Sequence, residues 1–502
     1  MQIAVRHNCG GGTISAIHVV CVSKRGCCVL RMVTKLSVIS LAALSLLILF
    51  AQPSLAAEAA PHIDGASLGP LWGVPFIALL LSIALLPLLA PGLWHHHYGK
   101  VALLWALAFL VPFAVLYGGE VALFELLHVM LIDYVPFIVL LFALYTVSGG
   151  IFLDGHINGT PLVNTSFLAL GTVLASAMGT TGASVLLIRP LLRANAGRRF
   201  SMHVVIFFIF LVSNIGGSLT PLGDPPLYIG FLKGVDFFWP TTHLWPAALL
   251  VSAILLALFF VVDMMLRERT QEVVSEAPVR LHGWINIVLL GAVIVVVLAT
   301  SVWKTDVQLH AGGVDVPFQD VVRVIALMAI AAMSMLFTPI RFREGNHFTW
   351  GPIVEVAKLF AGIFVTIVPV IAMLKAGHAG AFAPLLTMLS NPDGSPANAA
   401  YFWLTGGLSS FLDNAPTYLV FFNAAGGDAQ VLMHELPTTL VAISLGAVFM
   451  GANTYIGNAP NFMVKAIAEE AGIKMPSFFG YMLWSGLILI PTFVLVTYLF
   501  FR

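Results

Sequence analysis

Charged residues are scarce in this sequence. Of 502 residues, 23 are Lys or Arg and 23 are Asp or Glu, which makes the charged share 9%. Soluble domains carry about 25% charged residues, so this share, beside 59% hydrophobic residues, excludes a soluble globular protein and a disordered one. Because the positive and negative charges are equal in number, the chain has no excess positive charge to bind nucleic acid. The composition predicts an all-α polytopic membrane protein, with room for about ten to twelve spans.

Cysteine is also scarce. A disulfide scaffold is excluded because the chain has only four, namely Cys9, Cys21, Cys27 and Cys28. Residues 32–56 have the pattern of a cleavable signal peptide: a basic start, an apolar run, and small residues at Ser54 and Ala56. We therefore expect Met32 to be the natural start and 1–31 to be a mis-assigned one. The alternative for 1–31 is a Cys-rich metal or redox segment. Cleavage would place the mature N-terminus in the periplasm.

Twelve apolar runs follow the signal peptide. They lie at about 72–90, 101–118, 134–153, 166–192, 202–232, 246–265, 284–302, 321–338, 353–374, 400–424, 438–464 and 479–501. Short loops rich in Lys and Arg face the cytoplasm, and here these are 189–199, 266–283 and 339–350. The outward loops are 303–320, 391–399 and 425–437. We expect the bacterial inner membrane as the location.

Two of these runs must enter and leave the membrane on the same side. With the N-terminus outside, the run 166–192 begins and ends in the cytoplasm, and the run 400–424 begins and ends outside. Both have polar, helix-breaking residues in the middle. We predict two re-entrant hairpins, which membrane proteins tolerate where protein or a cavity shields them. About ten transmembrane helices remain.

The two halves of the chain resemble each other at an offset of about 234 residues. The segment 220–226 (TPLGDPP) aligns with 454–460 (TYIGNAP), and 180–184 aligns, at offset 233, with 413–417. Because the hairpins open toward opposite sides, the repeat is inverted in topology. Inverted repeats with broken helices are typical of secondary transporters whose site lies near the midplane.

This pattern divides the chain into six parts. We expect a mis-assigned start (1–31), a signal peptide (32–56), N-terminal scaffold helices (57–133), repeat 1 with its hairpin (134–265), connecting helices (266–352), and repeat 2 with its hairpin (353–502).

Polar side chains gather around the hairpin tips and helix breaks. Free N–H groups at helix starts attract anions, and free carbonyls attract cations. Hydroxyl, amide and carboxylate oxygens are hard ligands that suit Na⁺, Li⁺ or H⁺ rather than a soft metal. The candidate ion- or substrate-binding residues are Thr180, Thr181, Asn214, Thr220, Asp224, Asp413, Asn414, Thr417, Asn453, Thr454 and Asn458. Beside them lie Ser184, Ser213, Ser218, Ser409, Ser410 and Asn461.

Asp224 and Asp413 carry the most weight. A carboxylate at membrane depth is costly and usually marks an ion path or proton relay. The alternative for each is a turn or helix cap. Asp154, near a span end, is a candidate for a proton path, and a solvated loop is the alternative. Lys375 is the second candidate for a proton path, as a charge partner for an acid, and the alternative is a lysine that reaches the interface.

These motifs resemble the ion-transporter superfamily, which groups NhaD-type sodium/proton antiporters, citrate and dicarboxylate carriers, and arsenite permeases. The resemblance covers roughly residues 70–501 and is greatest to the sodium:proton antiporter and citrate transporter branch. The motifs that carry it are SNIGG (213–217), TPLGDPP (220–226), LDNAPT (412–417), GANT (451–454) and GNAP (457–460). The resemblance implies a scaffold domain, a transport domain that bears the hairpins, an elevator-like motion, and often a homodimer.

The hairpin tips depart from the pattern of the carboxylate carriers, which tend to have Ser-Asn-Thr at both tips. Here the tips begin with Thr180-Thr181 and Asp413-Asn414, which favours a cation. We therefore expect a Na⁺(Li⁺)/H⁺ antiporter in which Asp413 and Asp224 are alternating acceptors. The alternative is a Na⁺- or H⁺-coupled citrate or dicarboxylate carrier, although the breaks contain no Lys or Arg for a multivalent anion.

Other classes of protein fit less well. No nucleotide-binding loop and no large extramembrane domain is present, so ATP-driven transport is not expected. A receptor or scaffold would need an interaction domain, and no loop is long enough. We expect no enzyme activity, no cofactor, and no metal beyond the transported Na⁺. The expected partners are the lipid bilayer and a small cation or carboxylate, and nucleic acid is not expected.

Overall fold

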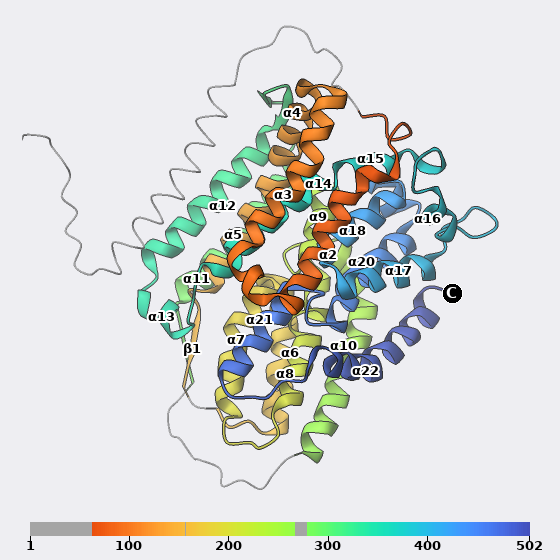
Figure 1. The fold of residues 1–502 in the computed structure, drawn as a ribbon. Helices are drawn as coiled ribbons and strands as arrows, with labels where there is room; N and C mark the ends of the chain where they lie inside the picture. Colours follow the sequence, from red (N-terminus) through yellow and green to blue (C-terminus); the bar gives the residue numbers. More distant parts are fainter. Residues whose placement is uncertain (1–62, 156, 267–278) are drawn as a thin grey trace, which may run out of the picture. The chain divides into compact units, whose positions relative to one another are not determined.

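Long apolar helices make up most of the computed structural model, which describes residues 63–155, 157–266 and 279–502 (Figure 1). Within these residues nine helices are long and apolar enough to cross a membrane, and one bent pair raises the number to ten. The prediction of an all-α polytopic membrane protein is confirmed. The expected mis-assigned start and signal peptide lie outside the described residues.

The first described helices lead up to the first hairpin. They are η1 (Pro70–Gly73), α2 (Val74–Leu89), α3 (Pro91–Tyr117), α4 (Gly119–His128), the π-helical turn η2 (Val129–Tyr134) and α5 (Val135–Ser148). The last three form one continuous span, Gly119–Ser148. The expected span 134–153 was therefore wrong at its start, and the expected boundary between 133 and 134 falls inside a helix. The charged Asp133 does not end this span, because the Lys233 ammonium pairs with it at 2.6 Å.

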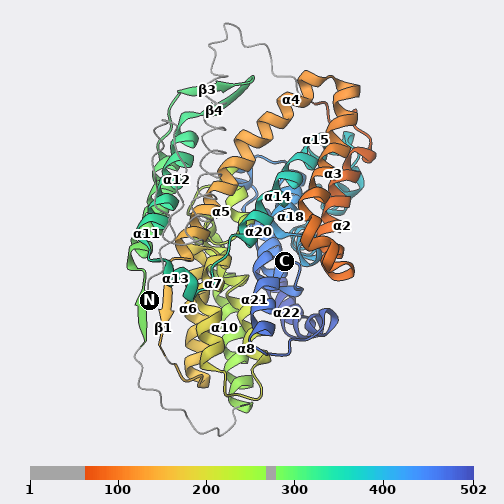
Figure 2. The ribbon, with the colours of Figure 1, turned by 60° about the vertical axis from the view of Figure 1, so that its left-hand side comes forward.

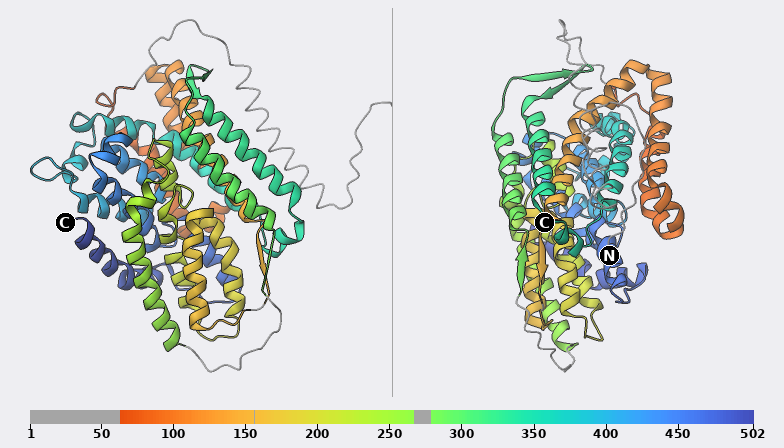
Figure 3. Two further views of the ribbon diagram at one scale, coloured as in Figure 1. Left: turned by 180° about the vertical axis from the view of Figure 1, so that it is seen from behind. Right: turned by 90° about the vertical axis from the view of Figure 1, so that its left-hand side faces the viewer.

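Repeat 1 contains the first hairpin and the first broken span. Its elements are β1 (Phe152–Asp154), α6 (Pro161–Met178), α7 (Thr180–Ala194), α8 (Met202–Leu211), η3 (Ile215–Leu219), α9 (Pro225–Leu232) and α10 (Trp239–Met265). The helices α6 and α7 pack together as the predicted hairpin, drawn in yellow in the left panel of Figure 3. Their joint is Gly179, whose φ of +82° is a conformation that favours glycine.

The connecting segment contributes two further spans. Its elements are β2 (Arg280–His282), α11 (Trp284–Val302), β3 (Gln308–Ala311), β4 (Val314–Pro317), α12 (Phe318–Phe337) and α13 (Ile340–Gly345). Strand β2 pairs antiparallel with β1, with Leu153 opposite Leu281. In Figure 2, α11 and α12 lie at the left edge and α2 and α3 at the right edge.

Repeat 2 contains the second hairpin and the second broken span. Its elements are α14 (Gly351–Thr366), α15 (Val368–Lys375), η4 (Gly377–Ala379), α16 (Ala383–Met388), α17 (Asn398–Phe411), α18 (Asn414–Ala424), α19 (Ala429–His434), α20 (Pro437–Met450), η5 (Gly451–Asn453), α21 (Ala459–Glu470) and α22 (Phe478–Phe500). The pair α14–α15 is bent by 41°. In Figure 1 the hairpin α17–α18 lies above the hairpin α6–α7.

A single offset of 234 residues relates the two repeats. Helices α7 and α18 begin at Thr180 and Asn414, and helices α9 and α21 begin at Pro225 and Ala459. The offset of 233 expected at the hairpin tips was therefore wrong. The residue that corresponds to Asp413 is the joint glycine of the first hairpin, since both are N-caps of the following helix.

The breaks are the segments between α8 and α9 and between α20 and α21. The same hydrogen bonds recur in both breaks. The Thr220 hydroxyl donates to the Ser176 carbonyl, and the Thr454 hydroxyl donates to the Ser410 carbonyl. In each break that threonine hydroxyl also accepts the N–H of the residue two positions further on, at 3.2 Å. Because the donors and acceptors correspond at one offset, each half folds its break by the same local interactions.

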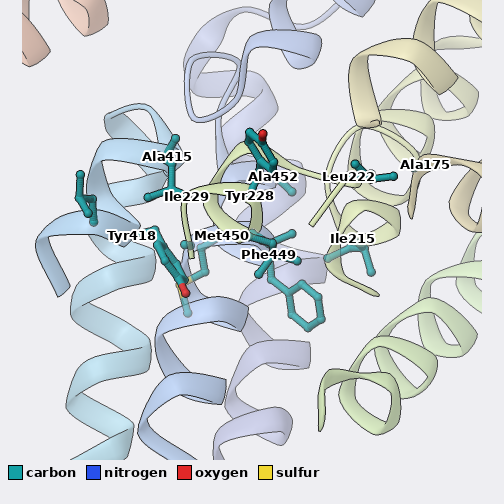
Figure 4. Close-up of a cluster of buried hydrophobic side chains, with 14 of the residues drawn as sticks. Ala175, Ile215, Leu222, Tyr228, Ile229, Ala415, Tyr418, Phe449, Met450 and Ala452 are labelled. Atoms are coloured by element: carbon teal, nitrogen blue, oxygen red, sulfur yellow. The ribbon is translucent and has the colours of Figure 1, made fainter. Parts of the chain in front are cut away.

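Each repeat packs against the opposite one. Helix α7 contacts α21, and α9 contacts α18, which are the two equivalent pairings of an inverted repeat. Figure 4 shows the apolar side chains behind the breaks, five labelled from each repeat: Ala175, Ile215, Leu222, Tyr228, Ile229, Ala415, Tyr418, Phe449, Met450 and Ala452. All ten are buried. Buried apolar side chains from both repeats therefore pack in one cluster at the breaks.

Close helix packing in repeat 2 gives a test of this fold. Helices α17 and α20 meet at Gly446, where an added Cβ would lie 2.6 Å from the Phe402 carbonyl oxygen. We expect Gly446→Val to destabilise the protein by about 1–3 kcal/mol, because backbone must move to admit the side chain. The measurement is the apparent melting temperature in detergent. The control is Gly407→Val, where an added Cβ meets nothing within 4 Å; equal melting of the two variants would contradict this packing.

Candidate functional site

Four helix N-termini converge on one buried carboxylate. Helices α7, α9, α18 and α21 each begin directly after a hairpin tip or a break. Asp224 is the N-cap of α9, and its carboxylate is bonded by the first residues of α7 and α18 and by the N-cap of α21. Helix N-termini carry unpaired N–H groups and partial positive charge. The arrangement therefore stabilises negative charge at this point.

Neutral donors surround the Asp224 carboxylate, which is 2% exposed. The Thr180 hydroxyl and the Asn458 amide donate to Oδ1 at 3.0 and 3.1 Å, and the Asn414 amide donates to Oδ2 at 2.5 Å. Within the described part of the chain, Asp224 forms no ion pair. A buried carboxylate without a cation is costly in a membrane. Either a cation or a proton can neutralise such a carboxylate.

A chain of amides joins the two breaks behind Asp224. The Asn458 amide also donates to the Ser213 carbonyl at 3.1 Å and to Asn214 Oδ1 at 3.3 Å. The Asn214 amide donates to Asn461 Oδ1 at 2.7 Å, and Asn461 donates back to the Gly451 and Thr454 carbonyls. This network holds the first break against the second at a fixed separation.

Two amide oxygens in this region lack hydrogen-bond partners. Asn414 Oδ1 and Asn453 Oδ1 are buried, and no described group donates to either. The orientation of Asn414 is set by its amide, which donates to Asp224, so its oxygen is available at the site. Buried polar atoms normally find partners. An unpartnered amide oxygen beside a carboxylate is a hard ligand of the kind that Na⁺ accepts.

Asp413 caps a helix, and its side chain also lines a cavity. Its Oδ1 accepts the Ala415 N–H at 3.1 Å, which caps helix α18, and the Thr417 hydroxyl donates to its main-chain carbonyl at 2.9 Å. The Asp413 side chain is half-buried and lines a cavity. The capping role therefore leaves the carboxylate accessible from that cavity.

The cavity has a volume of about 450 Å³ and reaches Asp224. Its polar lining includes Thr180, Thr181, Asp413, Asn458 and Glu355. Its apolar walls include side chains of α2, α5 and α14, such as Ile83, Leu140 and Phe360. Among the described residues, no Lys or Arg lines it. The charged groups of the described lining are therefore all acidic.

The structure gathers most of the predicted site residues but not all of them. Thr180, Thr181, Asp224, Asp413 and Asn458 line the cavity, and Asn214 and Asn414 bond within the amide network or to Asp224. In the breaks, Thr220, Asn453 and Thr454 form hydrogen bonds to Ser176 or Ser410. At the tip of the second hairpin, Thr417 forms a hydrogen bond to the carbonyl of Asp413, the N-cap of its own helix. Asp154 and Lys375 are exposed and do not line the cavity.

Sequence reasoning missed two residues near this site. The Ser176 hydroxyl donates to the Gly216 carbonyl at 2.5 Å, which matches the Ser410 bond to Met450 at 3.1 Å. The repeat offset was a signal that could have found Ser176. Glu355 lines the cavity and accepts the Trp94 indole N–H at 3.1 Å. No motif distinguishes it from an acid at a helix start.

Comparison with known proteins identifies the family. Residues 65–501 match a family described as "Putative citrate transport". The chain belongs to this citrate-transport family. This member is 27% identical to an uncharacterized transporter of Mycobacterium bovis and to one of Mycobacterium tuberculosis, over 330 residues that cover 63% of this chain and 71% of each relative. It is 25% identical over 333 residues to a 46 kDa membrane protein of Mycobacterium leprae, with the same shares.

Family membership and fold together support a multi-pass transporter in a lipid bilayer that carries a small solute. The expectation of a transporter rather than an enzyme agrees with both. The identity of the solute is a finer question, which the chemistry of the cavity addresses below.

The amide network gives a testable stability prediction. Asn458→Leu removes the donor shared by Asp224, Asn214 and the Ser213 carbonyl. We expect a loss of about 1–3 kcal/mol, because buried acceptors lose their partner, measured as a lower melting temperature in detergent. The control is Asn423→Leu, since the Asn423 amide is buried but donates only within its own helix, at 2.8 Å to Leu419. If both variants melt alike, the network does not hold the breaks together.

Proposed function

We propose that this transporter exchanges Na⁺ or Li⁺ for H⁺ across the bacterial inner membrane. Asp224 and Asp413 would be the alternating acceptors of the two ions. The observation that carries the proposal is the buried Asp224 carboxylate, which has three neutral donors and no cationic partner among the described residues. Either a proton or a small cation neutralises such a group, and only one of them can do so at a time.

The ligands for a small cation lie within one region. Asp224 supplies a carboxylate, the Thr180 hydroxyl oxygen contacts it, and Asn414 Oδ1 has no other partner. Asp413 supplies a second carboxylate on the wall of the same cavity. When Na⁺ binds here, it competes with the proton for the carboxylates. Exchange follows if the loaded site opens in turn to each side of the membrane.

The cavity gives the direction of access in this conformation. Its lining includes Trp94 and His95 at the start of α3, and Gly351 at the start of α14. Helix α14 follows the Arg-containing loop 339–350, which the distribution of basic residues assigns to the cytoplasm. On that assignment we propose that the cavity faces the cytoplasm, as in an inward-facing state.

The test uses purified protein in proteoliposomes with an acid interior and a pH-sensitive dye. Addition of Na⁺ or Li⁺ should release the dye quench, and K⁺ should not. Asp224→Asn and Asp413→Asn should each reduce the signal to that of empty liposomes, because an amide neither titrates nor carries charge. The control is Asp393→Asn, at an exposed loop acid that bonds only to nearby Ser395. Full exchange by Asp413→Asn or Asp224→Asn would exclude that residue as an acceptor.

A cation-coupled citrate or dicarboxylate carrier is the second candidate. Four converging helix N-termini can bind the carboxylate of a substrate as well as stabilise the carboxylate of Asp224. The family description also names citrate transport. In the same proteoliposomes, this candidate predicts no dequenching by Na⁺ alone. It predicts accumulation of labelled citrate or malate driven by a Na⁺ or pH gradient, which the antiporter would not catalyse.

A further inference from the structure

A second cavity lies between the two repeats, away from the candidate transport site. Its volume is about 740 Å³, and among the described residues none lines both cavities. Its basic lining comes from repeat 1 at Arg189, Arg193, Arg198 and Arg199 and from repeat 2 at Lys474. No described Asp or Glu is part of the lining. The described lining of this cavity is therefore basic, whereas the charged lining of the first cavity is acidic.

Two of these five cations already have carboxylate partners. Arg198 pairs at 2.5 Å with Asp263, which is fully buried and is also bonded by His203 at 2.8 Å. Arg189 lies 3.5 Å from Glu470, whose side chain is 64% exposed, a separation and exposure typical of a weak surface pair. The Asp263 cluster therefore fixes Arg198 in place as part of the wall.

The other three cations have no carboxylate partner within the described residues. Arg193 donates one N–H to the Leu153 carbonyl at 2.8 Å, and the Arg199 guanidinium lies 5.2 Å from the Phe200 ring. Lys474 forms no ion pair there. Three cations without a carboxylate partner among the described residues give this wall a positive potential. A multivalent anion is the ligand that such a wall favours.

The same cavity also has apolar lining at the level of the membrane surface. Phe200, Leu266 and Trp484 line it beside the cations. Helix α8 begins just after Phe200 and α10 ends just before Leu266, so the cavity lies where two spans end. This combination of cations and apolar groups at an interface is typical of sites for lipid headgroups.

We infer that this cavity binds a phosphate group through Arg193, Arg199 and Lys474. Guanidinium groups bind phosphate oxygens with two parallel N–H bonds, and Lys adds a point charge. The phosphate belongs either to the headgroup of an anionic phospholipid or to a free phosphate ion. Because its ligands come from both repeats, the bound group holds repeat 1 against repeat 2 and raises the stability of the protein.

The experiment uses the full-length protein purified in detergent. The probes are dioleoylphosphatidylglycerol, dioleoylphosphatidylcholine and inorganic phosphate, and the readouts are retained ligand in native mass spectrometry and the melting temperature. Wild-type protein should retain phosphatidylglycerol or phosphate and melt at a higher temperature with it. Arg199→Ala combined with Lys474→Ala should weaken binding by about tenfold or more, since charge-assisted hydrogen bonds are lost.

Two further variants serve as controls. Arg341→Ala removes an exposed arginine that stacks on Phe342 and does not line the cavity, so it should bind as wild type does. Arg199→Lys keeps the charge but loses the two parallel N–H bonds, so it should bind more weakly than wild type and more tightly than the double variant, which separates loss of the ligand site from misfolding.

Each outcome decides the question. Binding of phosphatidylglycerol that free phosphate does not displace, lost in the double variant, supports a lipid headgroup. Binding of phosphate that excludes the lipid supports a free anion. Equal binding by wild type and the double variant, equal binding of phosphatidylcholine and phosphatidylglycerol, or no binding of any probe overturns the inference.

Discussion

The rest of the structure depends on one constraint, a carboxylate held inside a membrane by neutral donors alone. Asp224 is stabilised by the ends of four half-helices and by three hydrogen bonds, which come from the two hairpin tips and from the second break. Broken helices are tolerated at membrane depth only when their free backbone groups are satisfied. The bonds from threonine hydroxyls to serine carbonyls in both breaks satisfy part of this demand. The carboxylate therefore depends on these interrupted segments for its donors, and the segments depend on polar side chains to satisfy their free backbone groups.

The two repeats share one arrangement of helices but have different side chains at equivalent positions of the site. At offset 234, Asp224 corresponds to Asn458, and Asp413 corresponds to Gly179. Each half thus contributes one acid, but at non-equivalent places: one at a break and one at a hairpin tip. Acids at equivalent positions would place one carboxylate in each break. These two carboxylates would lie close together, because Asn458 of the second break donates a hydrogen bond to Asp224 of the first. The observed substitution of an amide gives that position a donor and avoids repulsion between like charges.

Much of this arrangement could be predicted from the sequence, because hydropathy and helix-breaking motifs are local signals. The parity of the Arg-rich loops predicted both hairpins, and the motifs at 220–226 and 454–460 predicted the breaks. The continuation of the span from Gly119 could not be predicted, since the Lys233 partner of Asp133 is distant in sequence. The hairpin offset was off by one because the tips share no identical residue. Distance from the cavity, which separates Asp154 and Lys375 from the other candidates, is likewise a property of the fold.

The charges of the site also constrain the order of events in either candidate function. The partial positive charges of the helix N-termini are already opposed by the Asp224 and Asp413 carboxylates at the same positions. A carboxylate substrate that entered this cavity would meet those two acids and no described Lys or Arg. Repulsion is relieved only when a cation or proton occupies the acids first. Under either proposal, a cation or a proton at Asp224 would be the step that antiport and coupled carboxylate uptake have in common, and the two would differ in whether an anion follows it.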